Sequence, residues 1–183
     1  MRIALIWPKS PPFAKCRLPL GLGYLVSNMS PGHELKIIDC HLNNLDPTSP
    51  KFIETIQDFN PRVVGLSTDS MNYKDAVGFF LAVKSIIPEA ITIIGGPHAT
   101  CYPYKTMENQ HLDFLMRGEG ESSFPKFIEE LENTTPDWSK VPGLVYRTPD
   151  GSCKENETQL EMNLDNIKIP DYGYSLISLV NNR

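Results

Sequence analysis

The chain has 183 residues, of which 40% are hydrophobic and 21% charged, and its formal net charge is −5 at pH 7. This composition is that of a globular protein and excludes a disordered chain. The acidic balance argues against non-specific nucleic-acid binding, which needs a dense basic surface. No apolar run approaches the roughly 20 residues of a membrane-spanning helix, and the N-terminus lacks a signal peptide's apolar core. We therefore expect a cytoplasmic protein.

Strands and helices are predicted to alternate along the first 140 residues. The predicted strands are apolar runs bounded by Pro, Gly or Asn, namely Arg2–Trp7, Glu34–Asp39, Arg62–Ser67, Ala90–Ile94 and Leu112–Met116. Apolar residues at helical spacing predict helices over Leu18–Met29, from Ser49-Pro50 to Asn60, from Asn72 to Pro88, and from Ser122 or Ser123 onward.

This alternation predicts an α/β fold with a doubly wound, five-stranded parallel sheet covered by helices on both faces. Right-handed crossovers leave the strand orders 2-1-3-4-5 and 3-2-1-4-5, and we favour the first, which is flavodoxin-like and Rossmann-like. From residue 141 the pattern changes. Leu144–Tyr146 and Thr158–Leu160, on either side of Asp150-Gly151, predict a small β-hairpin, and 163–174 a linker. We therefore divide the chain into a domain over 1–140 and a hairpin and linker over 141–183, leading to a further domain.

Ligands of doubly wound sheets bind outside the carboxyl ends of the strands, at the point where the strand order reverses. The first loop, 8–20, leads through Leu20 into the start of a helix with Gly21 and Gly23, whose missing Cβ atoms allow a ligand close to the backbone. Close helix–sheet packing is the alternative explanation. The third strand is followed by four hydrogen-bonding side chains, those of Ser67, Thr68, Asp69 and Ser70. Capping of the next helix by Asp69 or Ser70 is the alternative there.

Two further glycine-rich loops reach the same edge. Gly95 and Gly96, followed by Pro97 and His98, close strand four, and such a pair indicates something large against the backbone. The last helix is preceded by a turn with alternating glycines, Gly118, Glu119, Gly120 and Glu121, whose amides can form a nest. Because its two carboxylates repel a bare phosphate, we expect a large, mostly neutral ligand.

The chain carries few catalytic or metal-binding signals. Cys16, Cys40, Cys101 and Cys153 lie far apart, and we interpret them as reduced structural thiols. The histidines are scattered, and no Walker A, H-E-x-x-H or G-x-S-x-G motif occurs. We predict no catalytic residue and no metal ligand, and expect a protein that binds something reactive without itself being the reaction centre.

Two motifs imitate other sites. Gly21-x-Gly23 followed by Asp39 is typical of part of a dinucleotide-binding fingerprint, but Val26 replaces the third glycine. The run Asp39-Cys40-His41-Leu42-Asn43-Asn44 is close to D-x-H-x-x-G, but it follows the second strand, at the sheet edge. We interpret it as the start of a loop.

Several motifs occur in order over residues 1–175, namely P-L-G-L-G-Y-L, the strand ending in Asp39, N-P-R-V-V-G-L-S, I-G-G-P-H-A-T, R-G-E-G-E, V-P-G-L-V-Y-R and I-P-D-Y. Together they resemble the N-terminal cobalamin-binding domain of B12-dependent radical SAM enzymes, most closely the subgroup of the anaerobic magnesium-protoporphyrin cyclase. The resemblance implies that the chain presents cobalamin to a downstream radical SAM domain of the same full-length chain. That enzyme would transfer a methyl group, or rearrange or cyclise its substrate, at an unactivated carbon.

The resemblance also implies roles for individual residues. Leu20, Gly21 and Gly23 would border the corrinoid, and Ser67 to Ser70 would hydrogen-bond its nucleotide tail or corrin amides. Gly95 to His98 would line the slot for the tail, and Gly118 to Glu121 would close the rim. The [4Fe-4S] cluster and S-adenosylmethionine are implied only for the further domain, because C-x-x-x-C-x-x-C is absent here. The first loop contains no histidine, so the D-x-H-x-x-G mode of cobalt ligation through that loop is not implied.

Two other functions remain open. A cofactor-free docking or substrate-recognition module could retain the same fold, and a hydrophobic plug in the cleft between strands one and three would favour it. An FMN-binding flavodoxin-like domain ranks lower. Its phosphate loop after strand one is usually rich in Ser and Thr, whereas this loop has Pro8, Pro11 and Pro12 beside Ser10.

Overall fold

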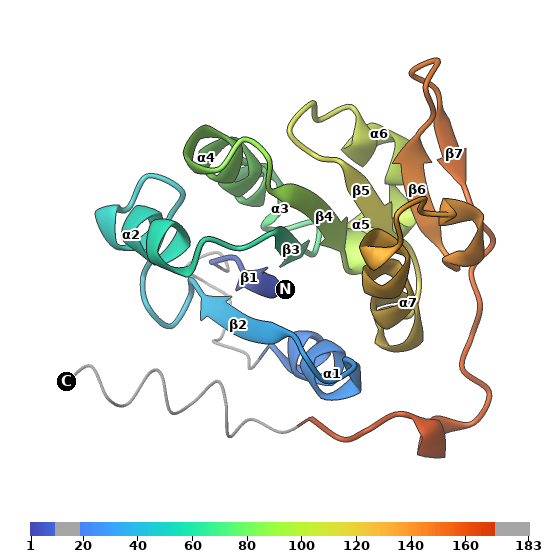
Figure 1. Ribbon diagram of the computed structural model, residues 1–183. Coiled ribbons are helices and arrows are strands. Elements are labelled where there is room, and N and C mark those ends of the chain that lie inside the picture. Colours follow the sequence, from blue (N-terminus) through green and yellow to red (C-terminus); the bar gives the residue numbers. More distant parts are fainter. Residues whose placement is uncertain (10–18, 171–183) are drawn as a thin grey trace.

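The computed structural model describes residues 1–9 and 19–170. Its seven strands form one sheet in the order β2-β1-β3-β4-β5-β6-β7 (Figure 1). The first five pair in parallel, whereas β6 and β7 are antiparallel. The strands are β1 (Arg2–Trp7), β2 (Glu34–Asp39), β3 (Val63–Ser67), β4 (Ile91–Gly95), β5 (Phe114–Met116), β6 (Leu144–Arg147) and β7 (Cys153–Glu155).

The predicted order 2-1-3-4-5 is confirmed for the parallel strands. The hairpin continues this sheet, because β6 pairs with β5. The prediction of Thr158–Leu160 as its second strand is wrong. The amides of Thr148 and Gly151 close a short turn around Asp150, by bonding to the carbonyls of Ser152 and Thr148, and this turn places Cys153 opposite Arg147. The predicted linker continues beyond residue 170, outside the described residues.

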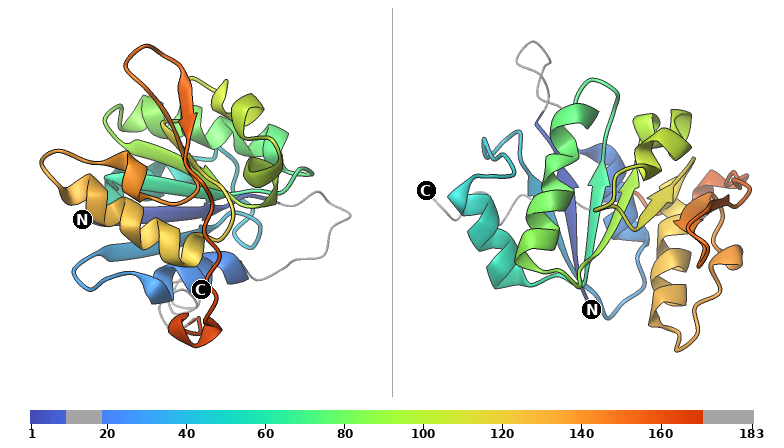
Figure 2. Two further views of the ribbon diagram at one scale, coloured as in Figure 1. Left: turned by 90° about the vertical axis from the view of Figure 1, so that its right-hand side faces the viewer. Right: turned by 90° about the horizontal axis from the view of Figure 1, so that it is seen from above.

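Helices cover both faces of the sheet (Figure 2). One face carries α1 (Leu20–Asn28) and α7 (Gly120–Glu132), and the other carries α2 (Pro50–Phe59), α3 (Tyr73–Ala76) and α4 (Gly78–Ile86). The predicted loop Gly95–Tyr102 contains the short helix α5 (Pro97–Cys101), and the short helix α6 (Pro103–Met107) follows it, each with proline at its first position. The short 3-10 turns are Trp138–Lys140 and Leu164–Asn166.

Strand side chains alternate between two buried clusters, because successive residues point to opposite faces. On the α2/α4 face, Ile6 and Val64 pack with Phe52, Phe79 and Phe80. On the α1/α7 face, the cluster contains Ile3, Leu5, Val63, Ile93, Leu22, Phe124, Phe127 and Ile128. No helix of the described residues is long and apolar enough to cross a membrane.

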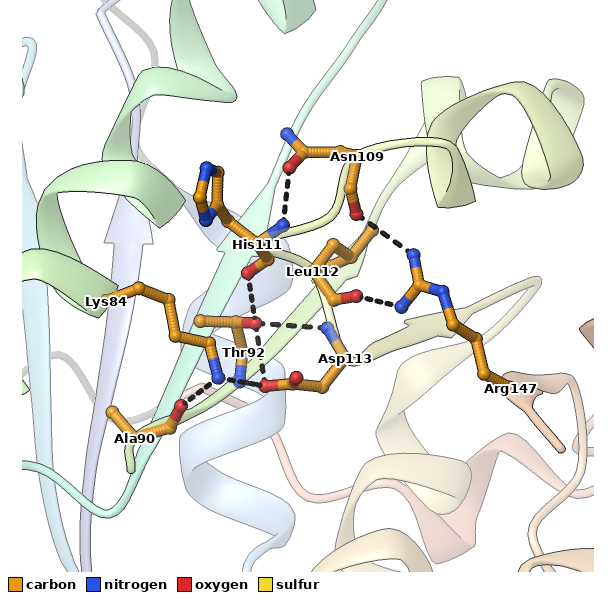
Figure 3. Close-up of polar contacts among 8 residues, drawn as sticks. All are labelled: Lys84, Ala90, Thr92, Asn109, His111, Leu112, Asp113 and Arg147. Carbon is orange, nitrogen blue, oxygen red and sulfur yellow. Dashed lines mark hydrogen bonds and ion pairs between the residues drawn. The ribbon is translucent and has the colours of Figure 1, made fainter. Parts of the chain in front are cut away.

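Polar contacts reinforce the short pairing of β4 with β5 (Figure 3). The Asp113 carboxylate accepts hydrogen bonds from Lys84 Nζ at 2.7 Å and from the Thr92 amide at 2.8 Å. The Thr92 hydroxyl donates to the His111 carbonyl oxygen at 2.7 Å and accepts from the Asp113 amide at 3.1 Å. These contacts hold the amino end of β5 against β4.

Arg147, at the end of β6, fastens the segment that leads into β5 (Figure 3). Its guanidinium donates to the carbonyl oxygens of Met107, Leu112 and Asn109, the last at 3.0 Å. The fixed fork of an arginine suits this arrangement, whereas an ammonium group cannot reach three diverging acceptors in the same geometry. The hairpin therefore supports the parallel sheet.

We expect Arg147→Lys to lower the free energy of unfolding by about 1–3 kcal/mol, because half-buried carbonyls lose their donors. Urea denaturation followed by circular dichroism measures this change. Lys105→Met is the matched control, since its ion pair with Glu108 joins side chains that are 73% and 64% exposed and such pairs contribute little. Equal midpoints for the two variants would contradict the role given to Arg147.

Candidate functional site

A pocket of about 290 Å³ opens at the carboxyl edge of the sheet, on its α1/α7 face. Its floor is made by Leu5, Gly65 and Ile93, which are register partners in β1, β3 and β4. Helices α1 and α7 form the opposite wall. The other lining residues are Gly21, Leu22, Leu25, Leu66, Ser67, Ile94, Gly95, Gly96, Pro97, Met116, Gly118, Glu119, Gly120, Glu121 and Phe124.

Glycine is the commonest residue in this wall. Six glycines line the pocket, which is half of the 12 in the chain. A Cβ at Gly65 would lie 2.7 Å from Leu5 Cδ2, and one at Gly96 would lie 2.6 Å from the Thr68 carbonyl oxygen. Gly96 also has a φ of +95°, a conformation that side chains rarely allow. The pocket therefore offers backbone and apolar surface to a ligand.

The structure brings nine of the fifteen predicted site residues to this pocket: Gly21, Ser67, Gly95, Gly96, Pro97, Gly118, Glu119, Gly120 and Glu121. Leu20, Gly23, Thr68, Asp69, Ser70 and His98 are not among the lining residues. Leu20 is exposed at the start of α1, and Gly23 is buried one turn further along. Most of the predicted first loop, residues 10–18, lies outside the described residues.

Asp69, Ser70 and His98 form a second group beside the pocket. Asp69 Oδ1 accepts from the amides of Met71 at 2.9 Å and Asn72 at 3.2 Å, so this carboxylate shapes the turn into α3. His98 Nδ1 lies 3.0 Å from the Ser70 hydroxyl, and the imidazole stacks on Tyr73 with 3.8 Å between ring centroids. Burial lowers the pKa of His98 and so favours the neutral ring, whereas the charge of Asp69 acts in the opposite direction.

Three buried side-chain atoms of the described residues lack a hydrogen-bond partner: Trp7 Nε1, Thr68 Oγ1 and His98 Nε2. They belong to the last residue of β1 and to the segments directly after β3 and β4. Buried polar groups without partners are rare and cost free energy. All three atoms lie at one edge of the sheet. A ligand with many polar groups would need such unpaired atoms at its site.

Acidic side chains mark the rim where α7 begins. Glu119 and Glu121 are the charged lining residues of the described part of the chain. Glu119 Oε2 accepts from the Glu161 amide at 3.0 Å, and Arg117 pairs with Glu155 of β7. The rim is thereby tied to the segment that follows the hairpin. No basic side chain among the described lining residues would attract a phosphate-rich ligand.

The run from Asp39 to Asn44 is a turn, as predicted. Asp39 Oδ1 accepts from the Leu42 amide at 2.8 Å, and Asn44 has a φ of +51°. Burial raises the pKa of the Cys40 thiol to about 12, so this thiol stays protonated. Within residues 1–9 and 19–170, no group of three or more His, Cys, Asp and Glu side chains could hold a metal ion.

Sequence reasoning missed Gly65, together with apolar lining residues such as Leu5, Leu25 and Phe124. A glycine inside a strand marks a close approach of something to the backbone. Gly65 carries this signal within V-V-G-L-S. The apolar neighbours carry none, because residues that line a pocket and residues that fill a core look alike in a sequence.

Known proteins share this fold and sequence pattern. The family of B12 binding domains matches residues 14–128. The cytidylyl-2-hydroxyethylphosphonate methyltransferase of Streptomyces wedmorensis is 31% identical over 157 residues, which cover 76% of this chain and 29% of that protein. The anaerobic magnesium-protoporphyrin IX monomethyl ester cyclase of Synechocystis sp. is 26% identical over 188 residues, covering 98% of this chain and 36% of that one.

A solved structure shows the same fold. The cobalamin-dependent S-adenosylmethionine radical enzyme OxsB with aqua-cobalamin bound superposes with a TM-score of 0.79 at 21% identity, over 92% of this chain and 24% of that chain. The chain thus spans about a third of the length of the curated relatives it matches. The family match takes in more than half of the chain and confirms the predicted family. This chain is a member of the B12-binding domain family.

Proposed function

We propose that the chain binds cobalamin at the carboxyl edge of its sheet and presents it to a radical SAM domain of the same full-length protein. The observation that carries this proposal is the glycine-lined pocket at that edge. A corrinoid is wide and rigid, so its binding needs backbone that it can approach closely. Its many amide groups match the partnerless polar atoms of Thr68 and His98 beside the pocket.

The size of the pocket suggests which part of cobalamin lies inside it and which part lies outside. A volume of about 290 Å³ suits the nucleotide tail, and the larger corrin ring would lie outside the mouth. We assign Gly95, Gly96 and Pro97 to the slot for the tail, with His98 beside it. Gly118, Glu119, Gly120 and Glu121 form the rim.

The polar residues after β3 and the start of α1 complete this assignment. Ser67 lines the pocket, so its hydroxyl is placed to hydrogen-bond the tail. Thr68, Asp69 and Ser70 would serve the corrin amides. Leu20, Gly21 and Gly23 would border the corrinoid from the start of α1.

When bound, cobalamin supplies the organometallic chemistry of the full-length enzyme, and the protein contributes binding and orientation. The apolar floor at Leu5 and Ile93 excludes water from the tail. The neutral His98 ring, held by Tyr73 and Ser70, can donate or accept one hydrogen bond through Nε2. We propose methyl transfer, rearrangement or cyclisation for the whole protein, with S-adenosylmethionine and the [4Fe-4S] cluster bound by the further domain.

Exposed apolar side chains support the role in presentation. Nine of the ten exposed large apolar residues in the described part of the chain follow the parallel strands or lie in 156–170. They are Leu20, Leu42, Met71, Tyr102, Tyr104, Leu160, Met162, Leu164 and Ile169. Leu20, Leu42, Met71, Tyr102 and Tyr104 follow the carboxyl ends of strands β1 to β4, the edge at which the corrin ring would lie. Exposed apolar groups at such an edge are typical of contact surfaces.

Two observations weigh against the alternatives. A docking module without cofactor would be favoured by a hydrophobic plug, but a pocket of about 290 Å³ remains between the strands and α1, with Leu5 of β1 and Gly65 of β3 in its lining. An FMN site needs donors for a doubly charged phosphate, whereas the charged lining residues of the described chain are Glu119 and Glu121. Both observations favour the cobalamin proposal.

Titration of the 183-residue chain with hydroxocobalamin is expected to shift the visible spectrum of the corrinoid, and desalting should leave it bound to the protein. Riboflavin 5′-phosphate, titrated in parallel, should pass through the column unbound. Loss of the corrinoid on desalting would remove the cofactor assignment. Retention of the flavin in its place would support the flavodoxin-like alternative.

Gly21 allows the pocket to be narrowed without disturbing the core, because an added Cβ there meets nothing within 4 Å. We expect Gly21→Ala to stabilise α1 by about 0.8–1 kcal/mol, and Gly21→Leu to weaken hydroxocobalamin binding by more than about tenfold through steric exclusion. Thermal denaturation and spectral titration measure the two effects. Ser85→Leu, on the exposed side of α4, is the control for adding a leucine. Unchanged binding by Gly21→Leu would place the ligand elsewhere.

The reading frame that encodes the chain tests the presentation role. We expect a C-x-x-x-C-x-x-C motif downstream of residue 183, because iron–sulfur clusters are held by closely spaced cysteine thiolates. Sequencing of the gene provides the observation. A frame without these cysteines would leave cobalamin binding in place but remove the radical SAM partner from the same chain.

A further inference from the structure

Thr100 links the ends of two pocket-lining strands. It lies in α5, behind Gly96, and its hydroxyl donates to the Gly96 carbonyl oxygen at 3.1 Å. The same hydroxyl accepts from the Gly118 amide, also at 3.1 Å. Gly96 follows β4 and Gly118 follows β5, and both line the pocket. One side-chain oxygen therefore joins two parts of the pocket wall that are distant in sequence.

The backbone of Thr100 strengthens this link. Its amide donates to the Gly96 carbonyl oxygen at 3.1 Å, so Gly96 accepts two bonds from one residue. Its carbonyl oxygen accepts from Arg117 Nε at 3.4 Å, and Arg117 in turn pairs with Glu155 of β7. The connection thus extends from the end of β4 to the antiparallel hairpin.

A wall of glycines needs such a connection. Glycine has more backbone freedom than any other residue, so a glycine-rich wall is loose unless its neighbours restrain it. Gly96 and Gly118 both have positive φ, at +95° and +73°. Restraint before the ligand arrives raises affinity, because less freedom is lost on binding.

We propose that Thr100 is a positioning residue that holds Gly96 and Gly118 in the arrangement that accepts cobalamin. This inference rests on the proposed function. A hydroxyl is required, since it donates to one glycine and accepts from the other. Valine has the same branched shape but can make neither bond, whereas serine keeps both.

The test compares three variants of the 183-residue chain by hydroxocobalamin titration and thermal denaturation. Thr100→Val removes the link, and Thr100→Ser restores the hydroxyl. Thr106→Val is the matched control, because the Thr106 hydroxyl donates to the carbonyl oxygen of Tyr102, four residues earlier, at 2.7 Å. This is the same contact within the neighbouring helix α6, away from the pocket lining.

We expect Thr100→Val to weaken cobalamin binding about tenfold, as the loss of one or two hydrogen bonds does. Thr100→Ser and Thr106→Val should stay within about twofold of the wild type. Amide hydrogen exchange at Gly118, measured without cobalamin, should accelerate in Thr100→Val and remain slow in the other two variants.

Each other outcome overturns a distinct claim. If the wild type binds cobalamin and Thr100→Val binds it equally well, Thr100 is not a positioning residue. If Thr106→Val weakens binding as much as Thr100→Val, the effect is general destabilisation, and the inference is wrong. If the wild type itself retains no cobalamin, the proposed function fails and this inference fails with it.

Discussion

The approach of the Gly96 backbone to Thr68 sets the geometry of the carboxyl edge. A Cβ at position 96 would lie 2.6 Å from the Thr68 carbonyl oxygen and 2.9 Å from its amide nitrogen. The Thr68 amide donates to Gly95, and the His98 amide donates to Thr68. Pairing between β3 and β4 thus continues past both strands. Any side chain at position 96 would separate them and displace α5, which carries both His98 and Thr100.

The antiparallel hairpin supports this edge from outside the pocket. Arg147 of β6 holds the segment before β5, and Glu155 of β7 pairs with Arg117 directly after β5. Gly143 comes close as well, since a Cβ there would lie 2.4 Å from the Arg117 carbonyl oxygen. The three-residue strand β5 is therefore held at both ends by residues beyond position 140. The predicted division of the chain assigned those residues to the hairpin and linker, apart from the domain over 1–140. The rim of the pocket depends on the hairpin.

Much of the fold could be predicted because the parallel strands are apolar runs, and short right-handed connections leave few orders for them. The glycine loops could be predicted because glycine pairs at strand ends have a specific steric meaning. The position of β7 could not be predicted, because its sequence, Cys-Lys-Glu, is polar. This strand pairs with β6 because the turn at Asp150 is tight. The link through Thr100 could not be predicted either, because its hydroxyl accepts a hydrogen bond from the amide of Gly118, which lies eighteen residues away.

Electrostatics at the start of α7 favour a ligand with little net charge. The N-terminus of a helix attracts anions through its exposed amides and its dipole. Here Glu119 precedes the helix and Glu121 lies in its first turn, so fixed carboxylates already occupy that field. A ligand with several phosphates would meet these charges without a basic side chain from the described lining to offset them. In the proposed function, selectivity against such a ligand therefore comes from repulsion by these two carboxylates.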